Sequence, residues 1–160
     1  MSSQTNTDGA EQVKLAVEAF LYGYPLVYNL HEIAKFPAGP NLVGPEALPF
    51  NTFGHARKLL DPSAHFVSPN NDTLYIIALC DVRNGPQVLQ VPDTHDRYYV
   101  LQFVDAWTNN FAYIGRRATG TSAARYLLTA HDDKGRTSGS MKVVHAPTGV
   151  FAIVGRIAVN

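Results

Sequence analysis

The chain has 160 residues, enough for one domain that buries a core without disulfides or a structural metal. Hydrophobic residues make up 46% of it and charged residues 16%, a balance that excludes global disorder. Thirteen basic residues offset thirteen acidic ones, so no long-range field attracts phosphates or anionic lipid, and no nucleic-acid partner is expected. The zero net charge also removes self-repulsion, which favours self-association.

The N-terminal part is predicted to be helical. Residues 1–8 are expected to form a disordered tail, and Asp8 followed by Glu11 has the spacing of a capping pair, so a helix should begin near Gly9. Pro25 predicts a kink near Tyr24, or two consecutive helices. Apolar residues three or four positions apart predict one helix face that packs on the rest of the protein: Val13, Val17, Phe20, Tyr24, Val27 and Leu30.

The remainder of the chain is predicted to be mostly β. Residues 36–49 are rich in proline and glycine and read as a loop, and 52–60 could hold a short helical turn. The predicted fold class is α+β, mainly β, with the kinked helical segment packed on an immunoglobulin-like antiparallel β-sandwich. Seven short runs bounded by turn residues read as its strands: 74–82, 87–91, 98–105, 110–114, 125–129, 141–145 and 150–157.

One domain is expected over residues 9–160, with a helical part at 9–60 and the sandwich at 61–160. Cys80 is the only cysteine and lies in an apolar run, so we predict a core thiol rather than a nucleophile. Six histidines are scattered with no pair at ligand spacing, so no metal site and no cofactor is indicated. No secretory signal and no apolar stretch of about 18 residues is visible, so we expect a cytoplasmic protein without a membrane span.

Four segments resemble the bacterial family catalogued as domain of unknown function 1254: FLYGYPLV at 20–27, SPNNDTLY at 68–75, VPDTHDRYYVLQFVDAWTNNF at 91–111 and FAIVGR at 151–156. The resemblance implies an N-terminal helical part followed by an immunoglobulin-like sandwich. Members usually continue into a larger second β domain, which we expect to be absent here. Any activity built at the junction of two domains would then need a second polypeptide or a homo-oligomer.

Two polar clusters could carry chemistry. Asn71 and Asp72 precede an apolar strand and offer oxygens that suit a sugar, a polar metabolite or a cation, although Asx turns use the same residue types. The second cluster lies on and after the 98–105 strand, where an indole could stack on a ring or simply fill the core. The candidate ligand-binding residues are Asn71, Asp72, Arg97, Asp105, Trp107 and Asn109.

Three functions remain open at this point. The first is a module that binds a small polar ligand, with the six candidate residues converging at one end of the sandwich. The second is an interaction or structural module that docks a partner β domain or self-associates. The third is a remnant or subunit of an enzyme that uses Asp72 or Asp105 as acid or base.

Overall fold

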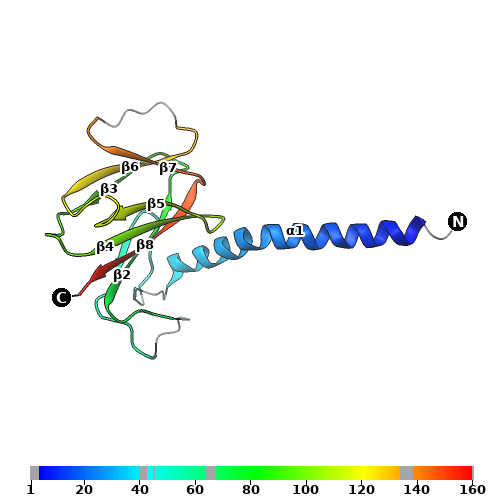
Figure 1. The fold of residues 1–160 in the computed structure, drawn as a ribbon, viewed down its shortest axis with the longest axis horizontal. Helices are drawn as coiled ribbons and strands as arrows, with labels where there is room; N and C mark the ends of the chain where they lie inside the picture. The colour runs from blue at the N-terminus through cyan, green and yellow to red at the C-terminus, as the bar shows by residue number, and fades with distance from the viewer. Residues whose placement is uncertain (1–3, 40–42, 45, 64–67, 134–138, 160) are drawn as a thin grey trace.

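The computed structural model describes residues 4–39, 43–44, 46–63, 68–133 and 139–159. One long helix, α1 (Gln4–Lys35), projects from a body of eight strands, and a short 3-10 helix, η1 (Phe36–Ala38), follows it (Figure 1). The fold is therefore α+β and mainly β, as the sequence predicts. The shape is a compact body with a protruding arm.

The helix differs from its prediction in three ways. It begins at Gln4, not near Gly9, so the tail predicted at residues 1–8 is helical from residue 4; residues 1–3 lie outside the described ranges. It continues through Pro25 as one helix, so the alternative of two consecutive helices is wrong, even though Pro25 has no N–H for the carbonyl of Leu21. The predicted packing face is exposed, because the described contacts of α1 with the body begin at Tyr22 and use another side of the helix.

The strands form two sheets. One has five strands in the order β1-β2-β8-β4-β5, and the other has three in the order β3-β6-β7. Every pair is antiparallel except β6 and β7, which run parallel and depart from the antiparallel expectation. The strands are β1 (Phe53–His55), β2 (Thr73–Asp81), β3 (Gln87–Val91), β4 (Tyr99–Asp105), β5 (Asn110–Gly115), β6 (Ala124–Ala130), β7 (Lys142–Ala146) and β8 (Val150–Ala158).

All seven predicted strands are confirmed, each within one residue at either end. The helical turn predicted at 52–60 is wrong, because β1 occupies 53–55 and pairs with the middle of β2, Phe53 opposite Ala78. This pairing also means that the sandwich begins before residue 61. A three-residue strand has too little periodicity to be recognised, and its ladder with a distant strand decides its conformation.

The core lies between the two sheets. Burial alternates along β4, with every second residue from Tyr99 to Asp105 buried, as period-2 packing requires. Phe103, Phe151 and Ile153 of the larger sheet are fully buried and join one cluster with Tyr126 and Leu128 of the smaller sheet. Phe103, Phe151 and Phe111 contact one another through their rings. The described body therefore has an apolar interior that does not depend on most of α1.

Candidate functional site

Helix α1 is anchored to the turn between β4 and β5. The ring of Tyr22 lies 5.2 Å from that of Trp107, and the side-chain amide of Asn29 donates to the backbone carbonyls of Asp105 (3.2 Å) and Ala106 (3.1 Å). Ile33, one helical turn further, is buried. These three helix residues lie seven and four positions apart and share one face, so the anchor uses a single side of α1.

Asp105 organises this turn. Its carboxylate accepts from the backbone N–H groups of Trp107 (2.9 Å) and Asn109 (2.8 Å), and from the Asn109 side-chain amide (3.3 Å). The residue is only 4% exposed. Thr108 is held at φ 70°, a strained value for a β-branched residue, and its N–H donates to the Asp105 carbonyl. The carboxylate is therefore engaged in shaping the turn.

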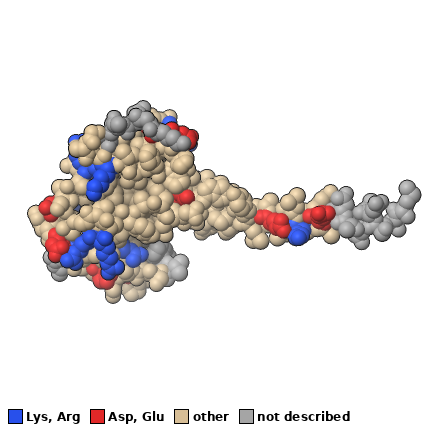
Figure 2. Space-filling model, turned by 45° about the horizontal axis from the view of Figure 1, so that its top comes forward, with Lys and Arg blue, Asp and Glu red and all other residues tan. Residues whose placement is uncertain are grey.

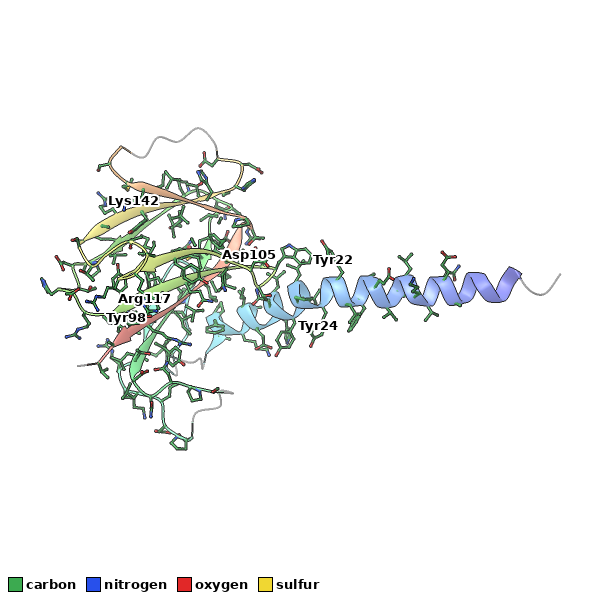
Figure 3. All side chains as sticks on the ribbon, in the orientation of Figure 1. Tyr22, Tyr24, Tyr98, Asp105, Arg117 and Lys142 are labelled. Atoms are coloured by element: carbon green, nitrogen blue, oxygen red, sulfur yellow. The ribbon has the colours of Figure 1, made fainter. Side chains whose placement is uncertain are left out.

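The six candidate residues do not meet. Asp105, Trp107 and Asn109 lie together at the α1 end of β4, whereas Arg97, Asn71 and Asp72 lie at the opposite end of the sheet, beside the end of β8. The seven residues of β4 span six steps along the strand, which separates the two groups by about 20 Å. Figure 3 shows the same separation between Asp105, on the side of α1, and Tyr98, on the far side. The predicted convergence is not observed.

The Asn70–Thr73 segment forms a local turn. The Asn70 side-chain oxygen accepts from the backbone N–H of Asp72 (3.4 Å), two residues on as in an Asx turn, and from the backbone N–H (2.9 Å) and hydroxyl (2.6 Å) of Thr73. Asn71 and Asp72 are exposed. The Asn70 side-chain nitrogen is buried without a hydrogen-bond partner among the described residues. The motif thus has a structural role at the entry to β2.

Arg97 lies at an open depression of about 610 Å³. The same loop holds Asp96, which forms a two-bond ion pair with Arg116 (3.0 and 2.9 Å). These charged groups are exposed to solvent, where ion pairs contribute little to stability. The depression is lined by residues 92–97 and Ile157. No group of three metal-ligating side chains occurs within the described ranges.

The most unusual surface lies on α1. Five residues that follow one another at spacings of four and three form what we call the apolar seam: Val13, Val17, Phe20, Tyr24 and Val27, exposed by 65%, 51%, 65%, 51% and 68%. The rings of Phe20, Tyr24 and Tyr28 contact in sequence along it, at 5.5 and 5.6 Å. The sequence pattern identified these residues, but it assigned them to internal packing.

The seam faces away from the sandwich. Tyr22, which contacts the β4–β5 turn, and Tyr24, which belongs to the seam, point to opposite sides of the helix in Figure 3. Figure 2 shows the helix between the body and its outer end as almost free of charge, with acidic and basic atoms gathered toward the N-terminal part. Those charges include Lys14 and Glu18, an exposed i,i+4 pair. The seam is therefore an uncharged apolar stripe that no described part of the chain covers.

The fold and this surface define a mainly β module that carries an exposed apolar helix. The model of the family described as "Protein of unknown function (DUF1254)" matches residues 50–160, and the chain belongs to this family. The matched part contains the sandwich but not α1. No curated protein matches the chain.

Among solved structures, the crystal structure of the VPA0106 protein from Vibrio parahaemolyticus is similar, with 28% sequence identity and a TM-score of 0.71. The similarity covers 92% of this chain and 33% of the Vibrio chain, so the present chain spans about a third of that protein's length. In the part of the chain that is described, no helix has the length and hydropathy needed to cross a membrane.

Proposed function

We propose that this chain is an interaction module in which the apolar seam of α1 docks a second polypeptide. The observation that carries the proposal is the exposure of all five seam residues by half or more. Water contact with so many neighbouring apolar side chains is unfavourable, at roughly 25 cal/mol for each Å². A partner that covers the seam removes this cost.

The exposed area supports a specific interface. A fully exposed aromatic side chain offers about 150–250 Å², so the half-exposed seam residues with their neighbours Leu21 and Tyr28 present on the order of 100 Å² each, about 700 Å² together. The largest apolar patch of a typical monomer is about 300–600 Å². Stable interfaces bury about 800 Å² on each partner. The seam is close to that size.

A protein partner fits the seam better than a lipid surface. Helices that lie on membranes carry many basic residues on the polar face. The sequence of α1 contains two lysines against four acidic residues. This balance disfavours anionic lipid and favours a polypeptide groove. We include a cytoplasmic location in this proposal. We also include an immunoglobulin-like topology for the sandwich.

The other two functions receive less support. A polar-ligand site needs its residues close together, whereas the six candidates lie in two groups at opposite ends of the larger sheet. An acid or base needs a free carboxylate in a cleft, whereas the Asp105 carboxylate accepts three hydrogen bonds within its own turn. Asp72 is exposed. The interaction module is therefore the function we propose.

Hydrogen exchange of the purified chain, measured together with its molecular mass, tests the proposal. In a monomer, the amides of residues 9–21 should exchange close to the unprotected rate, because every residue in this part of α1 is exposed. Protection there should arise only in an assembly. Slow exchange of these amides in a proven monomer would mean that the seam is covered by its own chain, which contradicts the proposal.

A further inference from the structure

We propose that the polypeptide that occupies the apolar seam is a second copy of this chain, bound antiparallel through α1. This inference rests on the proposed function and names its partner. The seam residues alternate in spacings of four and three, which is the repeat that keeps apolar residues facing a neighbouring helix in a left-handed pair. A surface with this repeat is complementary to a copy of itself, as a two-fold interface requires.

In an antiparallel arrangement, a seam residue of one copy lies opposite a different seam residue of the other copy. With the two-fold axis near Tyr22, Phe20 of one copy lies opposite Tyr24 of the other, and Val17 lies opposite Val27. Four aromatic rings then meet at the centre, and smaller valines close both ends. Aromatic pairs add about 0.5–1.5 kcal/mol to their area burial in general. The centre of the seam is where the interface is strongest.

The helix dipoles favour the antiparallel over the parallel arrangement. Glu11 and Glu18 lie on the side of α1 opposite to the seam, so they do not enter the interface in either arrangement. In the antiparallel pair, the uncharged residues 19–25 of the two helices lie beside one another. The helix dipoles then oppose one another, which is favourable. Because the chain has zero net charge, overall charge repulsion does not oppose the pairing of two copies.

The contacts that anchor α1 to the body leave the seam open for this pairing. The anchor of α1 uses Tyr22, Asn29 and Ile33, and the seam lies on the other side of the helix. The N-terminal end of each copy therefore passes on the side of the partner helix that faces away from the partner's sandwich. The two bodies come to lie at opposite ends of the helix pair.

The first test compares two lysine variants by sedimentation velocity of the full chain from 1 to 100 µM. Phe20 and Leu15 are equally exposed, at 65% and 67%, but only Phe20 belongs to the seam. We expect wild type and Leu15→Lys to form dimers, and Phe20→Lys to weaken the dimer about thirtyfold or more, as for loss of an interface hot spot. Equal dimerisation of both variants would overturn the inference.

The second test determines the orientation. The variants Val17→Cys and Val27→Cys, each with one new cysteine besides Cys80, are oxidised separately and as a mixture. The antiparallel pair should give the 17–27 disulfide in the mixture and little disulfide in either variant alone. Native Cys80 does not interfere, because it is buried. Predominant 17–17 or 27–27 disulfides would overturn the antiparallel assignment.

Failure of this inference is distinguishable from failure of the proposed function. A wild-type chain that stays monomeric at 100 µM, with rapid exchange at residues 9–21, excludes the second copy but leaves the seam as a docking surface for another polypeptide. A monomer in which these amides are protected excludes both.

Discussion

The Asp105 carboxylate accepts three hydrogen bonds close to the residues that anchor α1. Replacing it with alanine leaves the N–H groups of Trp107 and Asn109 without their acceptor in a buried turn. We expect Asp105→Ala to lower the free energy of unfolding by about 2–4 kcal/mol, measured by urea denaturation. Asp72→Ala is the matched control, because its carboxylate is exposed, and it should change stability by less than about 0.5 kcal/mol. Equal effects would contradict the structural role of Asp105.

Cys80 is buried, and desolvation raises the pKa of its thiol to about 12. The thiolate fraction at pH 8 is then about a thousandfold lower than in the unfolded chain, so iodoacetamide should label Cys80 only after unfolding. Mass spectrometry of native and guanidinium-treated protein measures this difference. Rapid labelling of the native protein would show that the thiol is accessible.

The same shift predicts a loss of stability in alkali. Between pH 9 and about pH 12 the unfolded chain releases the Cys80 proton while the folded chain retains it. The unfolded state therefore binds fewer protons, and stability falls as pH rises through this window. A Cys80→Ala variant should lose less stability over the same range in urea denaturation.

The sequence alone could identify the candidate polar residues, but not which of them lie close together in the folded chain. Asp105, Trp107 and Asn109 are close in the chain, so their grouping was accessible to local reasoning. Asn71 and Asp72 fall at the other end because β8 lies between β2 and β4, and this order follows from long-range pairing. No local pattern encodes which strand inserts between two others.

At the scale of elements, Asn29 links α1 to the body. Asn29→Ala removes two hydrogen bonds to the β4–β5 turn. We expect amide exchange at residues 26–33 to increase about tenfold, because roughly 1–2 kcal/mol of local stability is lost. Exchange in β4 and β8 should not change. Asn84→Ala, at an exposed turn residue, is the control and should leave α1 exchange as in wild type.

Seven of the eight described strands were predictable because each of them carries its own signal. Alternating burial along β4 and a continuous apolar run in β2 appear directly in the sequence and are bounded by turn residues. The helix was predictable in type but not in environment. Apolar residues at helical spacing indicate a face that is buried against something, and they do not say whether the cover belongs to the same chain.

At the scale of the whole molecule, the body and the arm should be separable. Removing residues 1–20 deletes Val13, Val17 and Phe20 but retains the Tyr22, Asn29 and Ile33 anchor. We expect this variant to be folded and monomeric, with a Tm within about 3 °C of wild type, by calorimetry and sedimentation. Aggregation of this variant would show that the outer part of α1 stabilises the sandwich.

Removing residues 1–34 is expected to have a different result, because the anchor is lost as well. The surface that Ile33 and Tyr22 cover becomes exposed, and we expect aggregation, measured by light scattering. A soluble monomer after this deletion would contradict a packing role for the helix end.

The position of β8 has a consequence for how the protein is made. β8 follows every other strand of its sheet in the sequence, yet it lies between β2 and β4 and pairs with both. Synthesis of the 68 residues between Asp81 and Val150 takes about 3–14 s, and β2 lacks its partner β8 during this time. We therefore expect the nascent chain to expose unpaired backbone edges of β2 and β4 until β8 is complete.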